Sequence, residues 1–321
     1  MKKSLFIVGG AGYIGSHMVK YAYEAGYEVV TLDNLSTGHR DAVKYGVFEF
    51  CELSDSKKLN ILFQKYCPAA VVHFGGVSIV NESIVNPLKY YINNVSGTLN
   101  LLDSMVKNNC LKLIFSSSAS VYGNPEYSPI DESHPKKPIN PYGKSKLIIE
   151  QMLEDFDTAY DLNYLTFRYF NAAGHDFEGE LSERHDPETH LLPLIVKAAL
   201  GENESVEIFG TDYNTRDGSC VRDYIHVKDL CEAHLKGLDL LFNSNTKPNS
   251  NFFNIGNSRG FSVKEVISEV KKVVGSEFKV INKSRREGDP EELVASNIKA
   301  FEVLKFSPKI TKIKDIIKTL L

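Results

Sequence analysis

The stretch Gly9-Gly10-Ala11-Gly12-Tyr13-Ile14-Gly15 decides how the rest of the chain is interpreted. Gly9, Gly12 and Gly15 recur at every third position. An apolar run at 5–8 precedes the stretch and predicts a strand, and a helical pattern at 14–25 follows it. Glycine permits a tight turn between the two and lets the backbone approach a pyrophosphate at the helix N-terminus. This order predicts a dinucleotide-binding turn; the alternative is a glycine turn that only packs a helix on a strand.

An acidic residue lies where the second strand ends. Asp33 follows the predicted strand 28–32, 21 positions after Gly12. A carboxylate at this place accepts hydrogen bonds from an adenosine ribose and repels a 2′-phosphate. The sequence therefore favours NAD over NADP.

Strand and helix patterns alternate through the first half of the chain. Strands are predicted at 5–8, 28–32, 47–50, 70–74, 113–115 and 164–167. Helices are predicted at 14–25, 56–66, 87–107 and 142–159. The alternation indicates an α/β fold, a doubly wound parallel sheet with helices on both faces and right-handed crossovers.

This rhythm changes after Gly174. Helices are predicted at 190–200, 228–242 and 262–274, strands at 224–227 and 252–255, and a surface loop at 243–251. Ser262 and Glu265 form the capping-box pattern that opens the last of these helices. We expect a Rossmann domain over 1–173, to which the chain returns within 222–256, and a smaller C-terminal α/β substrate domain over 174–321.

A tyrosine and a lysine stand four positions apart at the start of a predicted helix. Tyr142 and Lys146 share one helix face, and Pro141 before them signals helix entry. A lysine ammonium beside a phenol favours the phenolate, which can act as a base. The motif is weak alone, because Tyr224 and Lys228 repeat it in a strand-like stretch where the two side chains need not converge.

A serine run strengthens the interpretation of Tyr142. Ser116-Ser117-Ser118 directly follows the strand at 113–115, at the carboxyl edge where open α/β sheets bind ligands. Ser118 can donate to a sugar hydroxyl or share a proton with Tyr142. We therefore take Ser118, Tyr142 and Lys146 as the candidate catalytic residues.

Several charged residues have both structural and functional interpretations. Arg168 is as consistent with packing at the end of a strand as with a functional site. Arg222 and Asp223 are consistent with a local ion pair, and Arg285-Arg286 with a solvated turn. Separate arginines in the second lobe would also suit a diphosphate. His73 is more typical of a core histidine than of a ligand. No set of His, Cys, Asp and Glu residues has zinc-ligand spacing, so no metal is expected.

Composition narrows the class of protein. The chain has 321 residues, with 37 Lys and Arg against 41 Asp and Glu, a net charge of −4. This weakly acidic balance argues against nucleic acid as a partner. The five cysteines have no redox or metal spacing and indicate a reducing compartment, the cytoplasm. No apolar run approaches the ~20 residues of a membrane span, so no membrane partner is expected.

Taken together, the motifs resemble the extended short-chain dehydrogenase/reductase family, and within it the sugar-nucleotide epimerases. The resemblance rests on 9–17, 33–36, the serine run 116–123, 141–146, Arg-Tyr-Phe-Asn at 168–171, 217–227 and Arg-Arg-Glu-Gly-Asp at 285–289. It extends from Leu5 to about Ala300. It implies a tightly held NAD and a UDP-sugar substrate.

The resemblance also assigns binding residues. Those matching cofactor contacts are Gly9, Gly12, Tyr13, Ile14, Gly15, Asp33, Asn34, Ser36, Glu52, Leu53, Phe74, Gly75, Asn93, Ser118, Tyr142, Lys146 and Phe170. Those matching substrate contacts are Ser118, Tyr142, Asn171, Leu191, Phe209, Arg222, Arg286, Asp289 and Leu293. Glu52-Leu53 departs from the family's usual Asp-Ile near the adenine, and Gly75-Gly76 from its usual Ala-Gly or Ala-Ala.

The implied activity is a reversible 4-epimerisation of a UDP-hexose through transient oxidation at C4. Leu293 stands where a tyrosine accompanies restriction to glucose and galactose, so we expect UDP-N-acetylglucosamine to be accepted as well. A homodimer is also implied. The alternatives are a 4,6-dehydratase and a non-catalytic NAD-binding scaffold. The dehydratase is disfavoured because Ser118, Ala119 and Ser120 supply no carboxyl acid and base.

Overall fold

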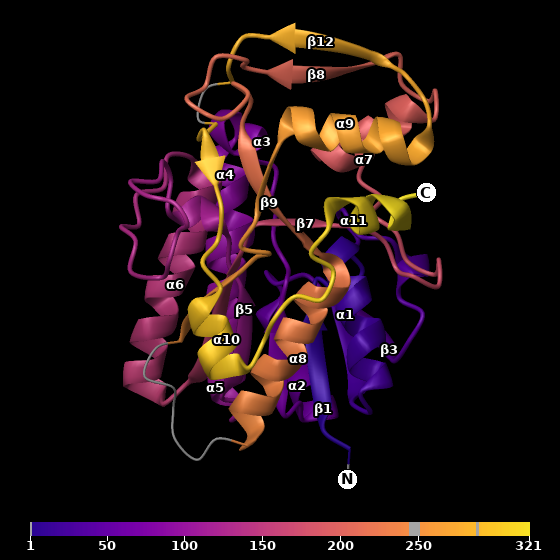
Figure 1. Ribbon diagram of the computed structural model, residues 1–321. Helices are drawn as coiled ribbons and strands as arrows, with labels where there is room; N and C mark the ends of the chain where they lie inside the picture. Colours follow the sequence, from indigo (N-terminus) through magenta and orange to yellow (C-terminus); the bar gives the residue numbers. More distant parts are fainter. Residues whose placement is uncertain (1, 244–250, 287–288) are drawn as a thin grey trace.

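A seven-stranded parallel sheet forms the centre of the computed structural model, which describes residues 2–243, 251–286 and 289–321 (Figure 1). Its strands are β1 (Ser4–Val8), β2 (Glu28–Asp33), β3 (Val47–Phe50), β4 (Ala70–His73), β5 (Lys112–Ser116), β6 (Asn163–Tyr169) and β10 (Phe252–Ile255). They lie in the order β10-β6-β5-β4-β1-β2-β3, and every neighbouring pair is parallel. The predicted doubly wound α/β fold is confirmed.

Helices cover both faces of this sheet, as a parallel sheet requires. One face carries α1 (Tyr13–Glu24), α8 (Val227–Asn243) and α10 (Ile298–Leu304), and the other carries α2 (Ser56–Tyr66), α5 (Gly97–Lys107) and α6 (Pro141–Tyr160). The alternating strand residues Phe6 and Ile7 are both fully buried and belong to the apolar clusters of opposite faces. Two cores therefore hold the sheet from both sides.

The single helix expected over 87–107 is divided. The structure has α3 (Val80–Val85), α4 (Pro87–Tyr90), a π-helical segment (Tyr91–Ser96) and then α5. Within the π segment, the buried side chain of Asn94 bonds the backbone of Val77 and the hydroxyl of Ser145. The wider turn accompanies this buried amide, which a regular amphipathic pattern does not predict.

The remaining elements form a smaller layer with a four-stranded and a two-stranded sheet, of which the two-stranded sheet lies at the top of Figure 1. Its strands are β7 (Asn171–Ala173), β8 (Ser205–Phe209), β9 (Val221–His226), β11 (Gly260–Ser262), β12 (Lys279–Lys283) and β13 (Glu292–Leu293). Its helices are α7 (Leu191–Ala199), α9 (Val263–Val274) and α11 (Ile313–Thr319). Single-turn 3₁₀ helices lie at Arg40–Ala42 and Ala119–Val121. The capping box of Ser262 and Glu265 is present as predicted.

The two parts of the chain are interleaved. β9 leads into α8, and β10 then joins the large sheet beside β6. The domain boundary near Gly174 stays a prediction. Most of the loop predicted at 243–251 lies outside the described residues. Among the described residues, no helix is both long and apolar enough to cross a membrane.

A buried ion pair joins α6 to the sheet. Arg168 at the end of β6 makes two hydrogen bonds of 2.9 and 2.6 Å to Glu150, and both side chains are 1% exposed. Ser117 also donates to Glu150, at 2.7 Å. Arg168 therefore has the strand-end packing role, and it anchors the serine turn to the helix of Tyr142. His73 is likewise a core histidine, with Nε2 2.9 Å from Thr98 Oγ1.

Candidate functional site

The glycine turn forms a close-packed cradle at the carboxyl end of β1. Gly9 has a φ of +76°, and a Cβ there would lie 2.6 Å from Gly75 N. A Cβ on Gly15 would lie 2.0 Å from Gly9 O. α1 begins after Gly12 with no side-chain cap and no acidic residue in its first turn. No side chain of the first turn therefore occupies the N–H groups at this helix end, which fits the pyrophosphate of NAD.

The carboxylate of Asp33 lies beside this glycine turn and also stabilises it through hydrogen bonds. Its Oδ2 accepts from Ala11 N at 2.9 Å and its Oδ1 from Leu35 N at 2.7 Å. Each oxygen keeps a second lone pair, so the carboxylate can also accept from a ribose. Asn34 accepts from Ser36 N at 3.1 Å, which shapes the following loop. This supporting role of Asp33 is one that the sequence did not indicate.

The other cofactor candidates come from separate loops. Tyr13 Oη donates to Gly174 O at 2.5 Å, and the ring of Phe74 lies 4.9 Å from that of His234. Leu53 O accepts from Asn100. Asn93, in the π-helical segment, is exposed and donates to Lys89 O in α4, whereas its neighbour Asn94 is the buried amide.

Tyr142 and Lys146 are both buried in the first turns of α6, 8% and 5% exposed. The Asn140 side chain caps this helix by accepting from Gly143 N, and Pro141 occupies its first position. Lys146 Nζ donates to Ser116 O at 2.8 Å and lies 5.9 Å from the centre of the Tyr142 ring. Ser118 hydrogen-bonds Tyr142. All three candidate catalytic residues therefore meet where β5 ends.

Burial governs the acid–base behaviour of this pair. It raises the pKa of Tyr142, and the hydrogen bond from Ser118 offsets only part of that rise. Burial also lowers the pKa of Lys146 to about 8, against the opposing charge of Glu150. The expectation that Lys146 lowers the pKa of Tyr142 towards neutral pH is therefore not met by the residues of the protein alone. The ammonium is directed at a carbonyl, and both groups lose solvation.

Four of the predicted substrate residues gather on the smaller layer. Arg286 lies over the ring of Phe209, 4.3 Å from its centre, and its Nε is 3.1 Å from Asp289 Oδ2. Arg222 Nη2 is 3.6 Å from Asp289 Oδ1. Two guanidinium groups thus converge on one carboxylate beside an aromatic ring. This arrangement suits a diphosphate joined to a flat base.

The neighbouring charged residues have other partners. Asp223 accepts from the backbone N–H groups of Asn257, Ser258 and Ala295, so the local ion pair suggested for Arg222-Asp223 is wrong. Arg285 pairs with Asp212 at 2.8 Å. The second tyrosine–lysine pair does not converge, because Lys228 lies over the ring of Phe177.

Leu293 lies between the candidate catalytic residues and the candidate substrate-binding arginines. It pairs with Arg222 in the β13–β9 register. Its side chain packs on the apolar cluster that contains Phe170 and Ala119, next to Ser118. Asn171 and Leu191 line a narrow pocket together with Tyr224, Glu183 and His190. A larger open groove near Arg216 and Lys272 is lined by none of the predicted site residues.

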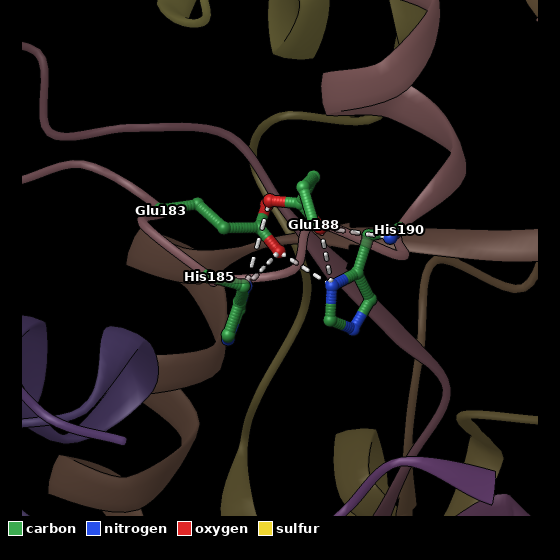
Figure 2. A group of neighbouring side chains, drawn as sticks. All are labelled: Glu183, His185, Glu188 and His190. Carbon is green, nitrogen blue, oxygen red and sulfur yellow. Dashed lines mark hydrogen bonds and ion pairs between the residues drawn. The ribbon is translucent and has the colours of Figure 1, made fainter. Parts of the chain in front are cut away.

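The structure also assembles a group that the spacing rules missed. Glu183, His185, Glu188 and His190 bring their side chains together in one loop before α7 (Figure 2). Burial alone would lower the pKa of His185, but the carboxylates of Glu183 and Glu188 outweigh it and raise this pKa to about 9. The pattern Glu-x-His-x-x-Glu-x-His at 183–190 is the signal that reveals the group.

Comparisons with known proteins agree with this geometry. Residues 5–256 match the model of the NAD dependent epimerase/dehydratase family. The chain is 45% identical over 306 residues to the UDP-glucose 4-epimerase of Rhizobium meliloti, covering 95% of this chain and 92% of that protein.

Solved structures give the same result. The UDP-glucose 4-epimerase of Brucella ovis in complex with NAD has a TM-score of 0.95 and 44% identity, covering 99% of this chain and 97% of that one. The UDP-Glc/GlcNAc 4-epimerase of Campylobacter jejuni has a TM-score of 0.86 and 40% identity, covering 99% and 98%. With its glycine cradle, Asp33 and the Tyr142–Lys146 helix in the family's matched region, this chain belongs to the NAD dependent epimerase/dehydratase family.

Proposed function

We propose that this protein interconverts UDP-hexoses at C4 in an NAD-dependent reaction, as a UDP-glucose 4-epimerase. The observation that carries the proposal is that an apolar cluster connects the candidate catalytic residues with the candidate diphosphate-binding arginines. Ser118, Tyr142 and Lys146 lie at the end of β5, and the apolar cluster with Leu293 links them to the pair of arginines around Asp289.

In this proposal the arginines hold the substrate far from the reacting carbon. Arg222 and Arg286 bind the diphosphate, and Phe209 lies against the uracil. Binding energy from this end orients the sugar without restricting its rotation. The hexose ring can then present either face of C4 while UDP stays in place.

Tyr142 is the general base. Its phenolate removes the proton from the sugar O4 hydroxyl as the C4–H bond breaks, which leaves a ketone at C4. Ser118 holds the same oxygen through its hydroxyl. Lys146, one turn along α6, supplies the positive charge that balances the phenolate. The glycine cradle and Asp33 would hold NAD, which would supply a hydride acceptor for C4 and, in its reduced form, a hydride donor, so that no cofactor would be consumed.

Conversion without added cofactor tests this function. Purified protein is mixed with UDP-galactose alone, and the nucleotide sugars are separated by chromatography. We expect an equilibrium mixture of UDP-galactose and UDP-glucose. A 4-keto-6-deoxy product would identify a dehydratase, and an unchanged substrate with bound NAD would identify the scaffold.

We also propose a homodimer. Ile84, Val85, Leu88, Ile92 and Leu99 expose 51, 83, 67, 52 and 46% of their surface along α3, α4 and the segments that follow. A second copy of the chain would bury this apolar face. Light scattering should give twice the chain mass for the wild type and a smaller mass for Leu88→Asp.

A cytoplasmic location is proposed on the cysteines. Cys51, Cys67, Cys110, Cys220 and Cys231 all lie in described parts of the chain, and all are free thiols. Free thiols are typical of a reducing compartment. Cell fractionation with an antibody against the protein checks this location.

A further inference from the structure

The four side chains of the loop before α7 converge on one point (Figure 2). His185 Nδ1 lies 3.2 Å from Glu183 Oε1 and 3.6 Å from Glu188 Oε2. His190 Nδ1 lies 3.0 Å from Glu183 Oε1 and 3.0 Å from Glu188 Oε1. One nitrogen from each imidazole and one oxygen from each carboxylate all fall within 4.8 Å of one another.

These separations are close to the edges of a metal coordination shell. A tetrahedron with Zn–N and Zn–O bonds of about 2.0–2.2 Å has edges of about 3.3–3.6 Å. The four nitrogen–oxygen distances of the cluster run from 3.0 to 3.6 Å, and the two that involve Glu188 reach its two different oxygens. The side chains would therefore have to adjust to place one atom of each on a central ion.

A second observation concerns the buried atoms. The side chain of Glu183 is 1% exposed and is directed into the cluster. Its Oε1 faces the Nδ1 atoms of His185 and His190 at 3.2 and 3.0 Å, although neither contact has the geometry of a good hydrogen bond at Glu183. A buried carboxylate oxygen requires a positive charge beside it, and a bound metal ion would take the place of the protons that these imidazoles otherwise carry. The group Asp176, Glu178 and Glu180 differs here, because it already encloses the ammonium of Lys20.

Further contacts hold the loop that carries these four side chains in place. Glu188 Oε1 accepts from the backbone N–H groups of Thr189 and His190, both at 2.8 Å, which orients its carboxylate. Arg184 pairs with Asp41 through two contacts of 2.9 Å. His190 is 51% exposed, which gives an ion a route in from solvent. Support of this kind around the ligands is typical of metal sites.

We propose that Glu183, His185, Glu188 and His190 bind one divalent transition-metal ion, best matched by Zn²⁺. Two imidazoles and two carboxylates suit zinc, whereas magnesium prefers six oxygen ligands. An ion that binds here displaces the protons of the two imidazoles to solvent, and two anionic and two neutral ligands then neutralise the charge of a divalent ion. Because His190 directly precedes Leu191 in α7, the ion would hold the segment that carries this residue of the narrow pocket.

Metal content of the purified, NAD-containing protein tests the site. The protein is stripped with EDTA, dialysed against excess Zn²⁺ and then against buffer, and analysed by mass spectrometry of its metals. We expect one Zn²⁺ for each chain and no retained Mg²⁺. Replacement with Co²⁺ should give the visible absorption of a tetrahedral site.

Two variants and one control locate the ion. His190→Gln, at the half-exposed ligand, should lower zinc affinity by more than the ~10–100-fold typical of outer-shell partners, and His185→Gln should do the same. NAD content and circular dichroism confirm that each variant is folded. His39→Gln removes a contact with the same loop, Nε2 to Arg184 O, without removing a ligand, and should retain zinc. Wild-type protein that keeps no zinc, or variants that bind it as well as the wild type, would overturn the proposal and leave an ion-pair cluster only.

Discussion

Lys146 and Tyr142 stand one helical turn apart in α6, with Lys146 Nζ 5.9 Å from the centre of the tyrosine ring and hydrogen-bonded to Ser116 O instead. Burial raises the pKa of Tyr142 and lowers that of Lys146 to about 8. Burial thus favours the neutral form of both side chains, and Ser118 is the hydroxyl partner of the tyrosine.

Replacing Tyr142 with phenylalanine tests the proposed base. Tyr142→Phe should keep the fold and the bound NAD but lower the rate of epimerisation by about 10²–10⁴-fold, the usual contribution of a general base. Turnover of UDP-galactose and released NAD are measured together. Tyr164→Phe, at a buried tyrosine of β6, serves as the control and should stay active. Normal turnover in Tyr142→Phe would remove this residue from the mechanism.

The bound nucleotide is expected to be NAD. The buried carboxylate of Asp33 lies at the end of β2 and binds the glycine loop at Ala11 N. Its charge repels the additional phosphate of NADP. The protein is denatured, and the released nucleotide is identified by mass spectrometry. Recovery of mainly NADP would contradict this role of Asp33.

Leu293 is expected to set the substrate range. Its side chain is smaller than tyrosine and packs against the apolar cluster that contains Phe170 and Ala119, so we predict that UDP-N-acetylglucosamine is epimerised as well as UDP-glucose. Leu293→Tyr should suppress the acetylated substrate and leave UDP-glucose nearly unchanged.

Initial rates with the two sugars check this prediction, with Ile298→Tyr as the control. Ile298 is 67% exposed in α10, so a tyrosine there should change neither rate. A wild type that converts only UDP-glucose and UDP-galactose would contradict the size argument.

The ion pair of Glu150 and Arg168 is expected to be essential for stability. Glu150→Gln leaves a guanidinium that is 1% exposed without its counter-charge, which costs about 3–5 kcal/mol of unfolding free energy. Urea unfolding measures this loss. Combining Glu150→Leu with Arg168→Met should recover most of it.

An exposed pair provides the comparison for this experiment. Asp103 and Lys107 are 45% and 59% exposed on α5. Asp103→Asn should therefore cost less than about 0.5 kcal/mol. Equal losses in Asp103→Asn and Glu150→Gln would show that burial does not set the cost.

Acid should destabilise the fold below pH 6.5. Burial lowers the pKa of His73 and His226 to about 3, and of His17 and His234 to about 4. These values lie below that of an unfolded histidine, so between pH 6.5 and 4 the unfolded chain binds protons that the folded chain does not. Stability is therefore present above pH 6.5 and lost as the pH falls, by about 1.4 kcal/mol for each group and pH unit.

Urea midpoints between pH 7 and 5 measure this loss. His73→Gln should reduce the dependence of the unfolding free energy on pH by the contribution of one proton, whatever the substitution does to stability at pH 7. His39→Gln, at a partly exposed histidine, is the control. A slope that His73→Gln leaves unchanged would show that His73 is protonated in the folded state.

Local pattern was sufficient for the large sheet and for the position of several candidate site residues. A strand such as 5–8, buried on both faces, is a continuous apolar run, and the glycines after it meet a backbone requirement that no other residue satisfies. Tyr142 and Lys146 share a face through helix periodicity alone. These features depend on neighbours in sequence, so the sequence by itself determined them.

Other features depend on contacts between distant segments, and only the tertiary structure decided them. The π-helical turn accompanies the burial of Asn94 against Val77 and Ser145. Arg168 is structural because Glu150, on another element, faces it. The pKa of Tyr142 is raised although Lys146 lies one turn away, because burial removes water from both groups. The pattern at 183–190 shows Glu and His residues close together in the sequence, but the convergence of their side chains depends on the path of the loop, since an irregular loop has no period to place side chains on one face.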